Sequence, residues 1–380
     1  MSNESESRAW VEVDLDALRD NYRTVREVIG PGPAIIAMVK ADAYGLGVGR
    51  VVRALEPLDP YAYGVATADE GAQLRDLGVR RPIFVFSPLP PQAVERAAAA
   101  GVCATISDVG ALELWSEAAR RHGPLEFHVE VDTGMGRAGF DWRRTTEWAP
   151  AVRAACGAHL RWTGVFTHFH SADSADATAA ETQWARLQDA LVQLPVSRED
   201  LLVHVANSAA ALRFPAFAGD AVRPGIFLYG GDPAPGVAGL PRPRPVAALR
   251  ARLVQVRDAP PGSTVGYGAT HVARSWARWG TVAVGYGDGV PRRLGNRGRA
   301  LLRGRVVPVI GRISMDMTVV DITGVPDAVV GDVVTLLGAD GPAGITLDQV
   351  AAQAATISYE ILTGLLSRLP RVEKDTWTGS

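Results

Sequence analysis

The sequence predicts an α/β protein, in which an N-terminal (β/α)8 (TIM) barrel precedes a mostly β domain. The first supporting observation is a series of eight short apolar runs in the first two-thirds of the chain. The second is that stretches with helical spacing lie between these runs. The third is a change in texture at residues 241–245 (PRPRP), after which β-type runs separated by Gly and Pro turns dominate.

The eight runs are continuously apolar and often β-branched or aromatic, as strands buried on both faces of a parallel sheet are. They are Ala34–Val39, Tyr63–Ala66, Ile83–Phe86, Val102–Thr105, Phe127–Val131, Gly164–Thr167, Leu202–Ala206 and Ile226–Tyr229. The helical stretches are Leu15–Val28, Asp69–Leu77, Pro91–Ala100, Val109–Arg121, Trp142–Cys156 and Thr178–Leu194. Asp14 stands where it can cap the first helix. Eight alternations of strand and helix favour a closed barrel over an open sheet.

The second region begins at the proline-rich boundary. Its β-type runs are Val246–Val256, Thr281–Val284, Ala300–Leu302, Val306–Ile310, Met317–Ile322 and Val333–Leu337, and a helix is expected at Thr346–Ala354. We therefore predict a barrel domain at 11–244 and a mostly β domain at 245–380, with residues 1–10 disordered.

Composition excludes several classes of protein. The chain has 380 residues, with 39 Lys plus Arg against 41 Asp plus Glu, so it has no overall basic field for nucleic acid or a membrane surface. Its two cysteines, Cys103 and Cys156, are too few for a disulfide framework or a CxxC zinc site, and we expect no metal. The polar start carries no secretory signal pattern and no apolar run reaches the ~20 residues of a membrane span, so we expect a cytoplasmic protein.

Candidate chemistry lies where the predicted strands end, because barrel active sites lie at the carboxyl ends of the strands. Lys40 directly follows the first apolar run, and a partly desolvated lysine amine has the lowered pKa that suits Schiff-base chemistry. The alternative is a strand-end lysine that extends into solvent. The other polar residues beside apolar runs are Asp132, Arg137, His168, Asn207, Ser208 and Arg223.

Nine segments carry a family resemblance. They are VKADAYGLG, DTGMGRAGF, THFH, ANSAA, RPGIFLYG, VGYGAT, GYGDGVPRR, GRISMDM and ISYEIL. In this order they resemble the signature segments of bacterial alanine racemases, which are pyridoxal 5'-phosphate (PLP) enzymes of fold type III. The resemblance runs from about Val11 to Val372. The resemblance covers essentially the whole chain.

The resemblance implies that Lys40 forms the covalent imine with PLP and that Tyr267 is the second catalytic base. Racemisation removes the Cα proton from one face and returns a proton to the other, so two acid/base groups on opposite faces suit it. PLP is the electron sink for the carbanion. Without the resemblance, Tyr267 could equally be a turn aromatic between two glycines.

The resemblance also implies the remaining site residues. Arg223 faces the pyridine nitrogen, which should stay unprotonated because arginine can only donate, and His204 is the partner of Arg223. The phosphate donors are Tyr44, Ser208, Tyr359 and the backbone N–H groups of Gly225 and Ile226, with Asn207 also at the cofactor and His168 beside its ring. Substrate contacts are assigned to Arg137, Met315 and Tyr286, with Glu130 and Asp316 behind them, and an access corridor to Asp173, Arg292 and Arg312. The competing interpretations are a helix cap for Ser208, a core histidine for His168 and a rim salt bridge for Arg223.

The chain departs from the family pattern at four positions. Many relatives have a carbamylated lysine where this chain has Glu130, and we predict that the Glu130 carboxylate orients Arg137 without modification. The other departures are Leu46, His170 and Met317, and together they leave substrate preference and rate open.

The predicted function is therefore PLP-dependent interconversion of L- and D-alanine by two bases, supplying D-alanine for peptidoglycan. The resemblance implies a homodimer with shared active sites, in which Tyr267 and Met315 complete the partner's site. The alternatives are a racemase for serine or another small amino acid, a fold type III decarboxylase, and a non-catalytic PLP-binding protein.

Overall fold

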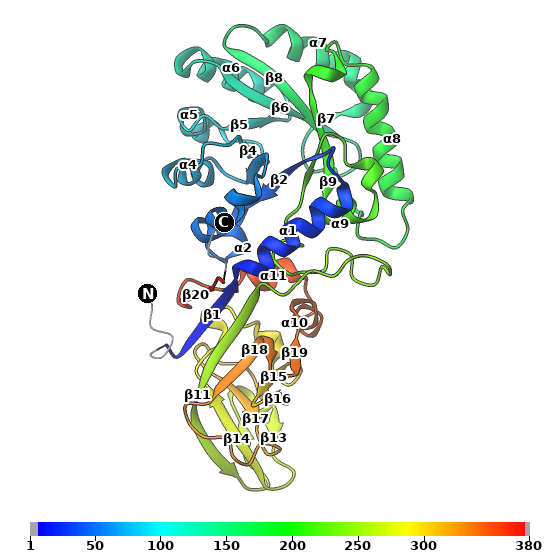
Figure 1. Ribbon diagram of the computed structural model, residues 1–380. Coiled ribbons are helices and arrows are strands. Elements are labelled where there is room, and N and C mark those ends of the chain that lie inside the picture. Colours follow the sequence, from blue (N-terminus) through cyan, green and yellow to red (C-terminus); the bar gives the residue numbers. More distant parts are fainter. Residues whose placement is uncertain (1–6, 377–380) are drawn as a thin grey trace.

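The computed structural model describes residues 7–376, which form a barrel and an adjoining β domain (Figure 1). The barrel strands follow one another in the order β2–β3–β4–β5–β6–β8–β9–β10, all parallel, and β10 pairs with β2 to close the ring. Their bounds are β2 Ala34–Met38, β3 Ala62–Val65, β4 Ile83–Val85, β5 Cys103–Ile106, β6 Leu125–Asp132, β8 Leu160–Phe166, β9 Leu202–Asn207 and β10 Ala221–Arg223. The short β7, Phe140–Asp141, adds to β6. The predicted barrel is confirmed.

The eighth strand lies earlier than predicted. We expected it at Ile226–Tyr229, but the strand is Ala221–Arg223, and the later residues form turns in which the Leu228 N–H donates to the Gly225 carbonyl (2.8 Å). Pro224 has no N–H to give to a neighbouring strand, so the regular strand ends at Arg223, although the Pro224 carbonyl still accepts the Met38 N–H of β2 (3.0 Å). Arg223 therefore stands at the carboxyl end of a barrel strand rather than before one.

The helices around the barrel largely follow the prediction. They are α1 Leu15–Ile29, α3 Val48–Leu55, α4 Ala68–Asp76, α5 Val94–Ala99, α6 Val109–His122, α7 Thr145–Ala155, α8 Thr178–Val192 and α9 Ser208–Arg213. Asp14 does cap α1, because its side chain accepts the Ala17 N–H (2.7 Å). The predicted helices at Pro91 and Trp142 begin with one 3₁₀ turn each.

The second domain is built on the long strand β11, Ala247–Ala259. Its other strands are β12 Thr264–Val265, β13 His271–Val272, β14 Ala277–Val282, β15 Arg299–Leu302, β16 Arg305–Ile310, β17 Thr318–Asp321, β18 Val333–Asp340 and β19 Ala343–Ile345. Two helices follow, α10 Leu347–Ala354 and α11 Ser358–Thr363.

Both ends of the described chain join the sheet of the second domain. Strand β1, Ala9–Asp14, pairs antiparallel with β11, and β20, Arg371–Lys374, pairs parallel with β1. The expectation of disorder is therefore wrong for Ala9 and Trp10, whose side chains are buried in this strand, while residues 1–6 lie outside the described residues. Burial in the sheet removes the large apolar surface of the Trp10 indole from water, which stabilises this strand.

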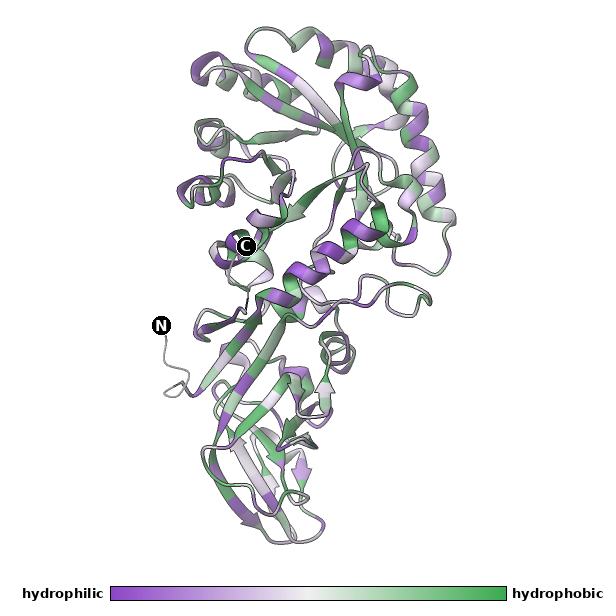
Figure 2. Ribbon diagram, viewed as in Figure 1, coloured by the Kyte–Doolittle hydropathy of each residue, from purple (hydrophilic) through white to green (hydrophobic). Residues whose placement is uncertain are grey.

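A continuous apolar core runs through the barrel and into the β domain. Figure 2 shows apolar residues along the barrel strands and alternating polar and apolar stretches on the outer helices, as expected when each helix buries one face. Within residues 7–376, no helix has both the length and the apolar character needed to cross a bilayer.

Candidate active site

A cavity of about 310 Å³ opens at the carboxyl ends of the barrel strands. It brings together side chains that are distant in sequence and come from the barrel and from α11. The predicted residues that line it are Lys40, Tyr44, Glu130, Arg137, His168, Asn207, Ser208, Arg223, Gly225, Ile226 and Tyr359. Residues that sequence analysis did not single out, among them Met38, Phe86 and Phe166, supply apolar walls.

Lys40 begins a left-handed turn, α2, that runs from Lys40 to Tyr44. Its four residues Ala41, Asp42, Ala43 and Tyr44 have φ angles of 53, 52, 53 and 56°. Each non-glycine residue in this conformation costs about 1–2 kcal/mol, so the surroundings must hold the turn in place. The Glu70 carboxylate accepts the Ala41 N–H (2.6 Å), and the Asp42 carboxylate accepts the Val48 N–H (2.7 Å).

The Lys40 amine lies in a setting that favours its neutral form. Burial lowers its pKa, and the positive charges of Arg137 and Arg223 lower the pKa further, while Glu70 opposes them. This direction agrees with the expectation from the sequence, although the Lys40 side chain remains accessible to solvent. Lys40 and Lys374 are the only two lysines in the chain, and Lys374 forms an ion pair with Glu12 (2.5 Å).

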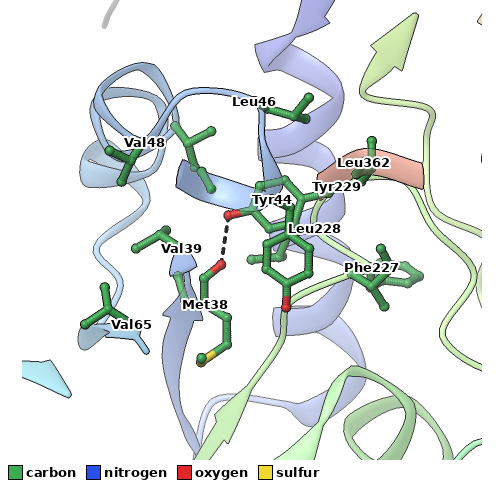
Figure 3. Packing of buried hydrophobic residues seen from close by; sticks show 14 of the residues in the cluster. Met38, Val39, Tyr44, Leu46, Val48, Val65, Phe227, Leu228, Tyr229 and Leu362 are labelled. Carbon is green, nitrogen blue, oxygen red and sulfur yellow. Dashed lines mark hydrogen bonds between the residues drawn. The ribbon is translucent and has the colours of Figure 1, made fainter. Parts of the chain in front are cut away.

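One end of the cavity carries hydroxyl groups. The Tyr44 ring stacks on Tyr229 with centroids 4.5 Å apart, and the Tyr229 hydroxyl donates to the Met38 carbonyl (2.8 Å), as Figure 3 shows. Tyr359 lies on the other side of Tyr44, at 6.1 Å between ring centroids. Burial raises the pKa of Tyr44, and it raises the pKa of Tyr359 to about 12. Both phenols therefore stay protonated and can donate to an anion.

Ser208 and Gly225 lie beside these phenols. The Ser208 hydroxyl accepts the Gly225 N–H (2.8 Å), and a Cβ atom on Gly225 would collide with the Tyr44 phenol oxygen. Glycine is thus required for this close approach. Ser208 is not the helix cap that was its alternative role: Asn207 caps α9, accepting the Ala210 N–H (3.0 Å).

Arg223 is buried and bound by neutral groups. One guanidinium nitrogen, Nη1, donates to His204 Nδ1 (2.8 Å) and to the His204 carbonyl (2.7 Å), and the other, Nη2, to the Thr167 and Val205 carbonyls (2.9 and 3.1 Å). Among the described residues no carboxylate forms a salt bridge with Arg223, so the rim salt bridge is not formed. Burial lowers its pKa to about 9, and it remains a cation at neutral pH.

A second histidine extends this network. His128 Nδ1 lies 2.7 Å from His204 Nε2. Because arginine only donates, His204 Nδ1 must accept, so Nε2 carries the proton and donates to His128. Burial lowers the pKa of His128 to about 3, which keeps both rings neutral. Sequence analysis missed His128; the available signal was a polar residue inside the apolar run of β6.

His168 and Arg137 complete the cavity wall. His168 Nδ1 lies 3.3 Å from Arg223 Nη2, and burial together with Arg223, Arg137 and Lys40 lowers the pKa of His168 to about 3. Arg137 lies on an exposed loop, which Asp132 holds by accepting the Gly134 N–H (2.9 Å).

The expected contact between Glu130 and Arg137 is not formed. Within the described residues, the one side-chain hydrogen bond of Glu130 is accepted from the Ser107 hydroxyl (3.3 Å). The glutamate is buried in β6, and its influence on Arg137 is electrostatic, without a direct hydrogen bond or ion pair between the two side chains in the described residues. Burial raises the Glu130 pKa, and Arg137 opposes that rise.

Three of the residues predicted to act on or contact the substrate do not line the cavity. Tyr267 is 66% exposed on a 3₁₀ turn between β12 and β13, Met315 is 52% exposed and Tyr286 is 39% exposed. Figure 1 places β13 at the end of the β domain remote from the barrel. Tyr267 therefore does not line the cavity that holds Lys40 of the same chain.

The loops that carry Met315 and Tyr286 are joined by backbone hydrogen bonds. The Tyr286 N–H donates to the Ser314 carbonyl (3.1 Å), and the Gly287 N–H to the Met315 carbonyl (2.8 Å). Asp288, fully buried, pairs with Arg8 (2.6 Å) and Arg368 (3.2 Å), and Arg368 pairs with Asp316 (2.7 Å). Sequence analysis missed Arg8, Asp288 and Arg368, which are ordinary charged residues until the fold brings them together.

The other singled-out positions take ordinary places. Arg312 lies against Gly268, beside the turn of Tyr267, and the negative charge of Asp173 contributes to the raised pKa of Tyr359. Leu46 is fully buried, whereas His170 is exposed and bonded to the Ser171 hydroxyl (2.6 Å). Met317 and Arg292 are on the surface of the second domain.

Comparison with known families decides what this arrangement belongs to. The family model described as "Alanine racemase, N-terminal domain" matches residues 13–233, and that described as "Alanine racemase, C-terminal domain" matches residues 246–373. The chain belongs to the alanine racemase family. A curated alanine racemase from Halothermothrix orenii is 37% identical over 368 residues, covering 96% of this chain and 97% of the relative.

Solved alanine racemases share the whole fold. The crystal structure from E. faecalis superimposes with a TM-score of 0.91 at 31% identity, covering 98% of this chain and all of that one. The structure from Bartonella henselae, described with covalently bound pyridoxal phosphate, has a TM-score of 0.88 at 29% identity and covers 97% and 100% of the two chains. The family depends on PLP, which confirms the predicted cofactor.

The residues present fit this cofactor. A lysine amine with a lowered pKa meets the need for a covalent attachment point. The cluster of protonated hydroxyls beside Gly225, where a side chain would fill the space, suits a phosphate. Arg223, a buried cation with only neutral partners, suits a ring nitrogen that accepts a hydrogen bond.

Proposed function

We propose that this alanine racemase uses Lys40 and Tyr267 as its two bases, contributed by different subunits of a homodimer. The observation that supports this most strongly is the division of the predicted residues. Those assigned to the cofactor converge in one cavity, whereas Tyr267 and Met315 are exposed on the other domain. A closed twofold dimer can bring such surfaces together twice.

Each cavity residue then has a role that follows from its chemistry. Lys40 would hold the cofactor through its Nζ atom until the amine of the substrate displaces it, which frees Nζ as a base, and Tyr44, Ser208 and Tyr359 would donate to the phosphate. Arg223 donates to the ring nitrogen, and His204 and His128 fix its orientation. PLP, when bound, withdraws the electron pair left behind as the Cα proton of alanine departs.

The proton moves between the substrate carbon and two protein atoms. In one direction Tyr267 Oη removes the Cα proton and Lys40 Nζ supplies one to the opposite face, and in the other direction the roles exchange. Arg137, which lines the cavity, is suited to the substrate carboxylate. Met315 and Tyr286 limit the space beside it, and Asp316 and Asp288 hold their loops. We also propose a cytoplasmic location and a supply of D-alanine to peptidoglycan.

The chemical test uses the small number of lysines. Incubation of the protein with PLP, followed by borohydride reduction and peptide mass spectrometry, should attach the pyridoxyl group to Lys40. Lys40→Ala should lose this label and the racemisation of L-alanine, measured by loss of optical rotation. Lys374→Arg, the matched control, should keep both.

The outcome that contradicts the proposal is a label on Lys374 alone, or racemisation that survives Lys40→Ala. Substrate preference is measured in the same assay by comparing kcat/KM for alanine and serine. A small pocket rejects one added hydroxyl only weakly, so a modest preference for alanine is expected.

A further inference from the structure

The Arg371 guanidinium, on β20, is fully used by main-chain carbonyls. Its Nε and Nη2 groups donate to the Gly45 carbonyl at 3.0 and 2.8 Å. A further Nη2 hydrogen goes to Leu365, and the two Nη1 hydrogens go to Leu366 and Leu369, each at 2.6 Å. An arginine has five N–H donors, and here each of the five has a carbonyl partner.

These carbonyls belong to two segments that reach the cavity. Gly45 ends the left-handed turn that begins at Lys40 and includes Tyr44. The three leucine carbonyls lie within the six residues that follow α11, the helix that carries Tyr359. The Arg371 side chain therefore joins the turn that carries Tyr44 to the segment that follows the helix of Tyr359.

The two segments also touch each other without a side chain between them. A Cβ on Gly45 would lie 2.6 Å from the Leu362 carbonyl oxygen of α11. Figure 3 includes Leu362 in the same packed cluster as Tyr44 and Leu46. Two backbones this close tolerate little relative movement, and the hydrogen bonds of Arg371 to both segments restrict that movement.

We propose that Arg371 is a positioning residue for cofactor binding: it fixes the Lys40–Gly45 turn against α11, so that Tyr44 and Tyr359 address one phosphate. This inference rests on the proposed function. It assigns to the carboxyl-terminal segment, which belongs to the sheet of the second domain, a direct part in shaping the barrel's cofactor end.

The residue type supports the proposal. Arginine presents a rigid, planar fork that can serve several acceptors at once, whereas a lysine has one nitrogen with three donors. No carboxylate among the described residues forms a salt bridge with Arg371, so its charge is not paired in the way a surface arginine's is. Within the same tail, Glu373 pairs with Arg53 (2.9 Å), an exposed arginine that does not contact the turn.

The experiment compares two cofactor forms on the full-length protein stripped of PLP. PLP and pyridoxal, which lacks the phosphate, are titrated into wild type, Arg371→Gln, Arg371→Lys and the matched control Arg53→Gln. For both Arg371 variants the Kd for PLP should rise at least about tenfold, as expected when charge-assisted hydrogen bonds to a phosphate are weakened. The Kd for pyridoxal should change much less, and Arg53→Gln should match wild type.

Three results would overturn the proposal. The first is an unchanged Kd for PLP in variants whose melting temperature falls, since this means a structural role only. The second is an equal loss for PLP and pyridoxal. The third is an Arg371→Lys variant that keeps the wild-type ratio of the Kd for PLP to the Kd for pyridoxal, because this would assign the effect to charge rather than to the planar guanidinium. If Arg371→Gln does not fold, Arg371→Lys alone provides the test. Failure of wild type itself to bind PLP would instead refute the proposed function.

Discussion

The barrel cavity and the loops of the β domain differ in how complete they are within one chain. The cavity has a lysine, phenols, a buried arginine and its histidine partners already in place. The β domain presents Tyr267 and Met315 to solvent, yet it supports the neighbouring loops with buried Asp288 and two arginines. Exposed side chains on firmly held loops are expected where a second molecule completes a binding surface.

This difference separates two tasks. Cofactor binding depends on contacts inside one subunit, so it should survive changes in the β-domain loops. In the proposed mechanism catalysis also needs the Tyr267 phenol, which does not line the cavity of its own chain. The predictions below test this separation, beginning with the largest effect.

Tyr267→Phe should reduce racemisation by about 10²–10⁴-fold, the usual contribution of a positioned acid/base group. Its affinity for PLP should not change, because Tyr267 does not line the cavity of its own chain. Steady-state rates and PLP titration measure the two quantities, with the exposed Tyr61→Phe as control. Loss of PLP binding, or full activity in the variant, would contradict the claim that cofactor binding and catalysis depend on different regions of the chain.

The sequence predicted the barrel well, and most of the residues it singled out for the cofactor line one cavity, because each strand end is a local signal. Lys40, His168 and Asn207 directly follow apolar runs, and the barrel brings such ends together. What it could not predict depends on distant contacts. Strand β1 forms only because β11 and β20 lie beside it, and the Pro224 boundary moved the eighth strand.

The same distinction explains the errors within the site. The expected Glu130–Arg137 contact failed because side-chain reach across a loop is not encoded in spacing along the chain. His128, Arg8 and Arg371 were missed because each acts through partners far away in sequence.

A smaller effect concerns the Lys40 amine in protein stripped of PLP. Because burial and two arginines lower its pKa, Lys40 should react with an amine-specific acylating reagent at lower pH than Lys374 does. Arg137→Leu removes one positive charge, so the Lys40 pKa should rise and its reaction should require higher pH. Mass spectrometry across a pH series gives both profiles, with Arg143→Leu as control. An Arg137→Leu profile shifted to lower pH would contradict the assigned electrostatics.

The most direct test of the shared site uses purified heterodimers carrying two affinity tags. A Lys40→Ala subunit paired with a Tyr267→Phe subunit should recover about half of wild-type activity, because twofold symmetry leaves one of two sites intact. A wild-type subunit paired with a Lys40→Ala/Tyr267→Phe subunit should be nearly inactive. The reverse pattern, with the first pair inactive and the second half-active, would mean that both bases act within one chain and would contradict the account.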